Sequence, residues 1–442
     1  MKVAMVSLGC SKNLVDAEQM LGLLNLANFE LVENEAIAEV IIVNTCCFVE
    51  SAKKENIETI LEMAEHKQSG NCKILIVSGC MAQRYKQEVI DNIPEVDAVI
   101  GTGQFDKIAD IIRDFEHNNI ADKVNCDGQT VNYDSLPRFR TTPKYTAYLK
   151  IAEGCDNSCT YCIIPSIRGK YTSRKMEDIV KEAEEMTREG VVELILIAQD
   201  TTSYGKDIYG ELKLPDLLKK LCAIDGIVWI RLHYCYPELI SDELIDVIAN
   251  NDKICKYLDI PIQHSNNLIL QRMNRRTTKE QLAKLIKKLR ARIPDIAIRT
   301  TVMVGFPGEQ AHQFAGVLKF IREHKFDRLG AFTYSQEEGT PAAEMIRQVK
   351  ESVKQARYDA LMLTHADILD EVQKAKVGKT FSVLVEGYDK IIEQYYGRTY
   401  ADSIEVDGRV YFTTNKKLEA GEFVNIKMTD YWDYDLFGDV AE

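Results

Sequence analysis

The first 115 or so residues repeat one pattern three times: an apolar strand that ends at a cysteine is followed by a helix. The strands end at Cys10, Cys46 and Cys80, and they read VAMVSLGC, EVIIVNTC and KILIVSGC. Strands that alternate with helices of this length predict a parallel, doubly wound sheet. Because the carboxyl ends of parallel strands meet at one edge, where ligands collect, we expect these three cysteines to converge.

Twelve cysteines are present in a chain that we expect to be cytoplasmic, and a reducing cytosol favours metal binding or redox roles for clustered thiols. Buried structural thiols are the alternative for any single cysteine. Three cysteines at the same point of three units favour a shared site. Cys47, Cys72 and Cys126 lack that placement and are expected to be packing residues, although Cys47 adjoins Cys46 and could compete as a ligand.

Composition limits the kinds of partner and location. The 442 residues are 45% hydrophobic and 28% charged, as in a soluble globular protein, with a net charge of −13. This charge disfavours general binding to nucleic acid and favours a basic protein partner or a small substrate. No apolar run reaches the roughly 20 residues of a membrane span. The start, MKVAMVSLGC, is too short and too quickly polar for a signal peptide.

A second strand–helix series follows a polar stretch with two prolines, and the chain ends in short strands broken by turns. The second series predicts a curled parallel sheet or partial barrel whose working face is the carboxyl end of its strands. The last part predicts a small antiparallel barrel of about five strands. The α/β chain is thus expected to comprise an N-terminal domain, a linker, a (β/α)6 partial-barrel core and a C-terminal barrel, at 1–116, 117–140, 141–372 and 375–442.

The segment EGCDNSCTYC places Cys155, Cys159 and Cys162 directly after the first strand of the second series. This spacing differs from the paired C-x2-C of zinc ribbons, although His233 and His264 at later strand ends could complete a zinc set. Short-spaced thiolates also hold iron–sulfur clusters, and a cubane with three protein thiolates leaves one iron free to bind a small molecule. The placement favours the iron–sulfur interpretation.

This C-x3-C-x2-C motif, with Tyr161 before its last cysteine, resembles the signature of the radical S-adenosylmethionine superfamily. The resemblance implies a [4Fe–4S] cluster on Cys155, Cys159 and Cys162 that cleaves S-adenosylmethionine to a radical. The three-part layout, with a C-terminal TRAM barrel, further resembles the methylthiotransferases. In that family the N-terminal cysteines, here Cys10, Cys46 and Cys80, hold a second [4Fe–4S] cluster that supplies sulfur, and a second S-adenosylmethionine supplies the methyl group.

Two branches of that family compete: the RimO type, which modifies the β-carbon of an aspartate in small-subunit ribosomal protein twelve, and the MiaB type, which modifies adenosine in tRNA. The RimO branch is favoured by several strings, namely SLGCSKNLVDAEQMLG, NTCCFVESAKKENIETI, IPSIRGKYTSR, LIAQDTTSYG, DIPIQH and YSQEEGTPAA. Two positions depart from the branch pattern: Cys47 stands where glycine is usual, and Asn266 where serine is usual.

The resemblance also implies partners and further contacts. Residues 376–442 hold eight basic and thirteen acidic residues, a net charge of −5 that suits a basic ribosomal protein better than tRNA. An electron-donor protein and a sulfur donor are expected, with no membrane and no tRNA. A non-catalytic, metal-binding scaffold at the ribosome is the alternative of a different class.

Several residues other than the cysteines are expected to contact the cofactor. Gly305 and Gly308 in VGFPGE would let the backbone approach the adenine or ribose, although such a turn is often structural. The strand-end Gln199 and Asp200 could bind the polar groups of S-adenosylmethionine. The complete expected set is Tyr161, Gln199, Asp200, Gln263, Gly305, Phe306 and Pro307.

Overall fold

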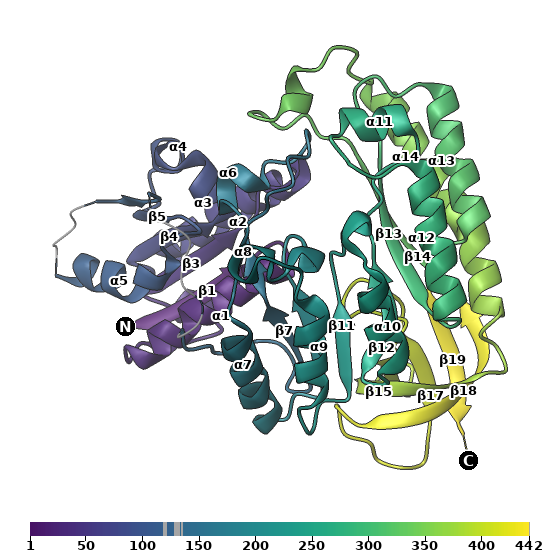
Figure 1. The fold of residues 1–442 in the computed structure, drawn as a ribbon. Coiled ribbons are helices and arrows are strands. Elements are labelled where there is room, and N and C mark those ends of the chain that lie inside the picture. The colour runs from purple at the N-terminus through teal and green to yellow at the C-terminus, as the bar shows by residue number, and fades with distance from the viewer. Residues whose placement is uncertain (118–121, 128–132, 134–135, 442) are drawn as a thin grey trace.

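The computed structural model describes residues 1–117, 122–127, 133 and 136–441 (Figure 1). Its N-terminal domain is a six-stranded parallel sheet with the order β2-β1-β3-β4-β5-β6. Every residue of the two central strands β3 and β4 is buried, as expected for parallel strands that are covered on both faces. The strands are β1 (Lys2–Ser7), β2 (Glu30–Leu31), β3 (Val40–Thr45), β4 (Ile74–Gly79), β5 (Ala98–Ile100) and β6 (Val124–Asn125).

Helices cover both faces of this sheet, and the side chains of the strands alternate between two apolar cores. Ile41 and Val43 pack with α2, whereas Val40 and Ile42 pack with α1 and α5. This arrangement confirms the predicted doubly wound domain. The helices are α1 (Ser11–Leu26), η1 (Glu35–Ile37), α2 (Glu50–Ser69), α3 (Cys80–Tyr85), α4 (Gln87–Asn92), η2 (Phe105–Lys107) and α5 (Ile108–Glu116).

The stretch expected to be a linker, 117–140, is partly an extension of the N-terminal domain. Its strand β6 pairs with β5, and the Sγ of Cys126 contacts the Ala82 carbonyl at 3.6 Å. The boundary of the N-terminal domain therefore lies beyond the predicted residue 116. Residues 118–121, 128–132 and 134–135 of the expected linker lie outside the described residues.

The core contains the six predicted strands, all parallel, in the order β14-β13-β12-β11-β10-β7. Since β7 and β14 lie at the two ends of this order, the sheet is an open partial barrel, as expected. The strands are β7 (Thr146–Lys150), β10 (Glu193–Ile197), β11 (Trp229–Leu232), β12 (Ile254–Asp259), β13 (Ala297–Val304) and β14 (Arg328–Thr333).

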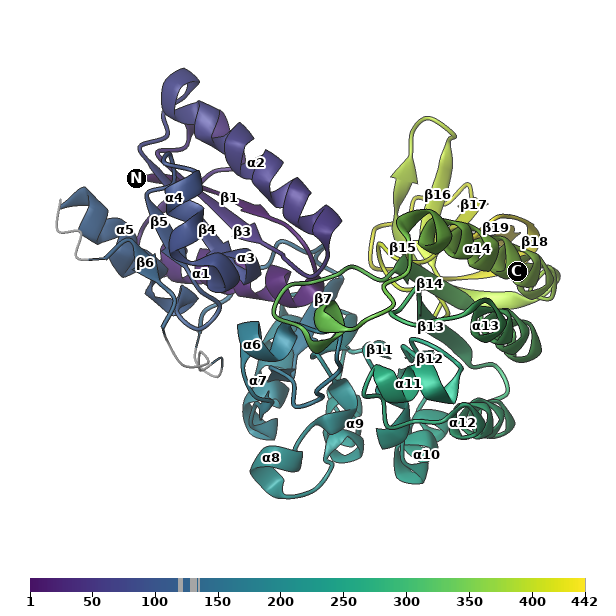
Figure 2. The same cartoon turned by 90° about the horizontal axis from the view of Figure 1, so that it is seen from above.

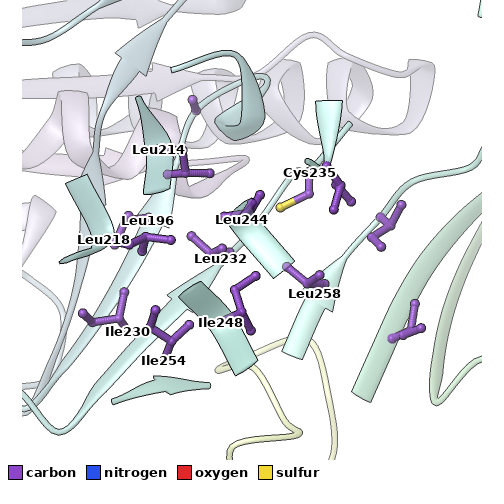
Figure 3. Packing of buried hydrophobic residues seen from close by; sticks show 14 of the residues in the cluster. Leu196, Leu214, Leu218, Ile230, Leu232, Cys235, Leu244, Ile248, Ile254 and Leu258 are labelled. Carbon is purple, nitrogen blue, oxygen red and sulfur yellow. The ribbon is translucent and has the colours of Figure 1, made fainter. Parts of the chain in front are cut away.

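An outer layer of helices packs on this sheet through leucine and isoleucine side chains. Figure 3 shows Leu214 and Leu218 of α9 and Leu244 and Ile248 of α10 among strand residues such as Leu232. Their burial supplies the main apolar core of the protein. The outer helices are α7 (Met176–Arg188), α9 (Leu214–Cys222), α10 (Asp242–Asn250), α12 (Lys279–Arg292), α13 (Ala311–His324) and α14 (Glu351–Lys374).

Short elements occupy the connections at the carboxyl end of the core strands. The pair β8 (Ala152–Glu153) and β9 (Thr172–Ser173) encloses the cysteine segment and α6 (Ile164–Arg168). The remaining short helices are η4 (Thr201–Ser203), α8 (Lys206–Tyr209), η5 (Pro237–Leu239), α11 (Asn267–Arg272) and η6 (Pro341–Glu344). Among the described residues, no helix combines the length and apolarity needed to cross a membrane.

The C-terminal part is a closed barrel in the order β15-β16-β17-β19-β18. Four of its five pairings are antiparallel as predicted, but β17 and β19 run parallel. An odd number of strands cannot alternate in direction all the way around a closed barrel, so one parallel pairing is unavoidable. The strands are β15 (Thr380–Asp389), β16 (Gln394–Arg398), β17 (Val410–Thr413), β18 (Phe423–Trp432) and β19 (Asp435–Val440).

The C-terminal barrel binds the amino-terminal end of the core strands through buried charges, on the side away from the N-terminal domain (Figure 2). Glu193, the first residue of β10, accepts from Arg398 at 2.6 Å and from Arg231 at 3.0 Å. In the loop 399–409, Ser403 contacts His233 at 2.8 Å and Ile404 packs among strand side chains of the core. The barrel thus closes one end of the core and leaves the carboxyl end for a site.

Glu193→Gln is expected to reduce the free energy of unfolding by about 3 kcal/mol at neutral pH, because it leaves buried guanidinium groups without their counter-charge. Burial opposes ionisation, yet Arg398 and Arg231 lower the pKa of Glu193 to about 2. The unfolded value is about 4.3. The stabilisation by this carboxylate is therefore complete above that pH and is lost as the pH falls toward 2. Urea midpoints at several pH values measure the difference between variant and wild type.

Glu243→Gln is the matched control, since Glu243 forms an exposed ion pair with Lys219 at 2.9 Å. Its effect on stability is expected to stay below about 1 kcal/mol. A Glu193→Gln protein as stable as the wild type at neutral pH would contradict the assigned role of the buried charge.

Candidate functional site

One cavity of about 470 Å³ lies between the N-terminal domain and the carboxyl end of the core strands. Loops that follow β1, β3 and β4 reach it from one side, and the loop between β8 and α6 reaches it from the other. All six predicted cysteines line this single cavity: Cys10, Cys46, Cys80, Cys155, Cys159 and Cys162. The structure therefore brings together two thiol sets that lie far apart in the sequence.

The N-terminal thiols come together at the point where the strand order of the sheet reverses, between β1 and β3, which is where open α/β sheets bind ligands. Gly9 precedes Cys10 and has a φ of 93°, and a Cβ there would lie 2.5 Å from the Cβ of Cys46. Gly79 precedes Cys80 and has a φ of 90°. A glycine before Cys10 and before Cys80 thus permits a backbone turn that a side chain would obstruct, whereas Cys46 follows Thr45.

Two buried cations lie beside the N-terminal thiols. The Nε of Arg168 donates to the Sγ of Cys80 at 3.4 Å. Burial opposes ionisation of Cys10, but the charges of Lys12 and Arg168 outweigh it and lower the pKa of that thiol. Burial raises the pKa of the Cys46 thiol. The cations supply the positive charge that thiolate ligands require.

Cys47 also lines the cavity, although its pattern predicts a packing residue. It is fully buried in the apolar core of the N-terminal domain, as Cys72 and Cys126 nearly are. Burial raises the pKa of the Cys47 thiol to about 12, which disfavours the thiolate that a metal needs. Cys47 nevertheless lines the same cavity as the six predicted ligands.

A buried charge network connects the N-terminal domain to the core beside these thiols. Arg168 of α6 donates to Asp16 of α1 and to Glu153, each at 2.9 Å. Lys150 of β7 binds the same two carboxylates, Glu153 at 2.8 Å. Tyr133 donates to Glu153 at 2.8 Å. Although burial alone would raise it, Arg168 and Lys150 hold the pKa of Glu153 well below its usual value.

A second group of ion pairs also joins the N-terminal domain to the core. Glu337, in the loop after β14, binds Arg84 of α3 at 2.8 Å and Lys53 of α2 at 3.0 Å. Its side chain is buried, and Figure 2 shows this loop extending from the core toward the N-terminal domain. Buried ion pairs therefore join the N-terminal domain to the core at two separate places.

The core cysteine loop is positioned by hydrogen bonds from the neighbouring strand ends. Asp200 accepts from Asn157 within that loop at 2.8 Å, and the Sγ of Cys159 lies 3.0 Å from the Tyr236 hydroxyl. Burial raises the pKa of Cys155 to about 11 and that of Cys162 to about 12. These two thiols are therefore protonated at neutral pH until a metal displaces their protons.

Three of the residues expected to contact a cofactor line the cavity: Tyr161, Gln199 and Gln263. The side-chain carbonyl oxygens of Gln199 and Gln263 are buried without a hydrogen-bond partner among the described residues. Gln263 also has a φ of 65°, in the left-handed region. A buried acceptor without a partner is costly, so both oxygens are available to a bound ligand.

The other four expected contacts do not line the cavity: Asp200, Gly305, Phe306 and Pro307. The Asp200 carboxylate accepts from Asn157, Thr202 and Ser203. The amide of Gly305 donates to Glu309 at 2.9 Å, and a Cβ on Gly305 would lie 2.3 Å from Lys354. Phe306 is fully buried. In this structure the VGFPGE turn is packed against α14, which is the structural alternative for such a turn.

The histidines considered for a zinc set also do not line the cavity. His233 contacts Ser403, and the Nδ1 of His264 accepts from the amide of Asn266 at 2.9 Å. Across the described part of the chain, no three His, Cys, Asp or Glu side chains converge as they would around one ion.

Charged residues that sequence reasoning missed complete the cavity: Lys12, Arg168, Asp259, Arg275 and Arg299. Arg299 binds Asp259 at 3.1 Å, and Arg275 stacks 4.0 Å from the Tyr236 ring centroid. Asp259 ends β12, so the strand-end rule that located the cysteines could also have identified it. The two arginines gave no comparable signal, since their role depends on tertiary contacts.

Three family models match the chain in sequence. They are described as uncharacterized protein family UPF0004 at residues 2–101, the radical SAM superfamily at 149–321, and the TRAM domain at 377–441. Among solved structures, the radical S-adenosylmethionine methyltransferase TsrM from Kitasatospora setae aligns with a TM-score of 0.59 at 11% identity. That alignment covers 83% of this chain and 89% of TsrM, and it shows a shared fold.

Similar sequences extend over the whole chain. The ribosomal protein uS12 methylthiotransferase RimO of Acetivibrio thermocellus is 52% identical over 99% of this chain and 98% of its own length. The RimO protein of Clostridioides difficile is 51% identical over 100% of this chain and 99% of its own length. The chain therefore belongs to the RimO family of radical SAM methylthiotransferases.

Proposed function

We propose that this chain methylthiolates the β-carbon of an aspartate in ribosomal protein uS12. The observation that carries the proposal is one cavity lined by two sets of three thiols in a chain similar to RimO proteins over its full length. An aliphatic C–H bond is not acidic enough for a general base, so radical chemistry from a cofactor is required.

The residues present fit two [4Fe–4S] clusters. Each set offers three thiols, and buried cations or hydrogen-bond donors lie beside each set. When bound, the clusters and two molecules of S-adenosylmethionine supply the radical, the sulfur and the methyl group. Cys155, Cys159 and Cys162 would hold the cluster that acts on S-adenosylmethionine, and Cys10, Cys46 and Cys80 the cluster that delivers sulfur.

The other cavity residues orient the reactants and exclude water. The free carbonyl oxygens of Gln199 and Gln263 would accept hydrogen bonds from polar groups of S-adenosylmethionine, and Tyr161 would contribute an apolar wall. Arg168 neutralises the N-terminal thiolates while the charge network keeps its guanidinium in place. The cavity lies between two domains, which would shield a reactive radical from solvent.

Partners and location follow the same proposal. The net charge of −5 on residues 376–442 suits a basic ribosomal protein and disfavours tRNA. An electron-donor protein and a sulfur donor, which renews the N-terminal cluster, act with the enzyme in the cytoplasm.

The proposal predicts a change in the mass of uS12. Anaerobically reconstituted enzyme with S-adenosylmethionine and reductant is expected to replace one hydrogen of uS12 by a methylthio group, as detected by mass spectrometry of the tryptic peptides. Unmodified tRNA, supplied in a parallel reaction, is expected to remain unchanged. Methylthioadenosine in that tRNA together with unmodified uS12 would favour the alternative branch.

Replacing one thiol set at a time is expected to separate cleavage of S-adenosylmethionine from transfer of the methylthio group. Changing Cys155, Cys159 and Cys162 to alanine should remove about half of the iron and acid-labile sulfide and abolish formation of 5′-deoxyadenosine. Changing Cys10, Cys46 and Cys80 to alanine should remove the other half, retain cleavage of S-adenosylmethionine and abolish transfer of the methylthio group. Metal analysis and chromatography of the nucleoside products measure these effects.

Two single variants serve as controls for the iron content. Cys222 is a half-buried residue of α9 that does not line the cavity, and Cys222→Ala should retain all the iron. Cys47→Ala should also retain all the iron if Cys47 is a packing residue and not a ligand. Loss of iron in Cys47→Ala would identify this residue as a ligand. A wild-type protein that holds zinc without sulfide would instead support a non-catalytic scaffold.

A further inference from the structure

Four cationic side chains line the cavity, and two of them already bind carboxylates. Arg168 pairs with Asp16 and Glu153, and Arg299 pairs with Asp259. Lys12 and Arg275 also line the cavity. Within the described part of the chain, no carboxylate lies within ion-pairing distance of either of these two.

Lys12 is the second residue of α1 and is only 8% exposed. Its Nζ lies 3.1 Å from the ring centroid of Tyr234. Tyr234 adopts a φ of 59°, a left-handed conformation that costs free energy in a non-glycine residue and places the aromatic ring under the ammonium. The ionisable neighbours of Lys12 include the Cys10 thiol and Tyr234, and no carboxylate among the described residues compensates this buried ammonium, so it is available to the anion of a ligand.

The two cations lie beside different thiol sets. Arg275 stacks on Tyr236, whose hydroxyl contacts Cys159, and Arg275 also donates to the Pro261 carbonyl at 2.9 Å. Lys12 follows Cys10 by two residues and belongs to the N-terminal domain. A ligand anion at Lys12 would therefore lie near the thiols proposed to hold the sulfur-delivering cluster.

We propose that Lys12 binds the carboxylate of the target aspartate in uS12 and so determines the choice of that residue; this deepens the proposed function and rests on it. In aspartate the β-carbon is bonded directly to the carboxyl carbon. Fixing the carboxylate therefore fixes the reacting carbon between the two thiol sets, which is the positioning that an oriented reaction needs. An asparagine in the same place would lack the charge that the buried ammonium requires.

The proposal predicts a charge-dependent preference in binding. Cluster-loaded enzyme without reductant is titrated with wild-type uS12 and with uS12 whose target aspartate is changed to asparagine. Wild-type enzyme is expected to bind the aspartate form about tenfold to a hundredfold more tightly, as for a hydrogen bond to a charged group. Lys12→Met should bind both forms equally, and Lys12→Arg should keep the preference. Such a double-mutant cycle isolates the contact between the two residues.

Lys54→Met, an exposed lysine of α2, is the matched control and should bind as the wild type does. If wild-type enzyme binds neither form of uS12, the proposed function itself fails. If wild type prefers aspartate and Lys12→Met keeps that preference, the function stands and the role of Lys12 is wrong. Equal binding of both forms of uS12 by the wild-type enzyme also overturns the proposed role of Lys12. The proposed role of Lys12 is also wrong if the Lys12→Met protein loses iron but keeps the preference for aspartate. Lys12 would then stabilise the cluster and not bind the substrate.

Discussion

The structure depends on the buried ion network in which Arg168 and Lys150 of the core share Asp16 and Glu153. These charges connect the N-terminal domain to the core at the position of the thiols, and Arg168 also contacts Cys80. Removing one member would leave buried charges unpaired, at a cost of several kcal/mol. The contact that unites the domains therefore also sets the electrostatics of the site.

The C-terminal barrel restricts the site from the opposite end. Buried pairs between Glu193 and the arginines at 231 and 398 seal the amino-terminal end of the core strands. Chemistry is confined to the carboxyl end, where the N-terminal domain completes the cavity. The third part of the chain thus closes the interior of the open sheet, and Asp407 of its loop also pairs with the cavity-lining Arg299 at 3.7 Å.

The sequence predicted the two α/β sheets and the cysteine cavity because each rests on local patterns. Strand–helix alternation places strand ends at one edge, and each N-terminal cysteine closely follows a strand. The predicted contact of the Gly305 turn with the cofactor had less support, since a short glycine motif does not reveal that Lys354 packs against it. The boundary at residue 116 shifted for a similar reason: the two residues of β6 carry too little pattern to indicate a strand.

The sequence by itself determined the order of the three parts and the thiol residues that converge, because strand ends and residue spacing are local properties. Only the tertiary structure decided which charges meet in the cavity. Lys12, Arg168 and Arg275 come from three separate segments, and whether each is paired depends on the contacts around it. Burial makes those pairings energetically decisive, and burial is a property of the folded chain as a whole.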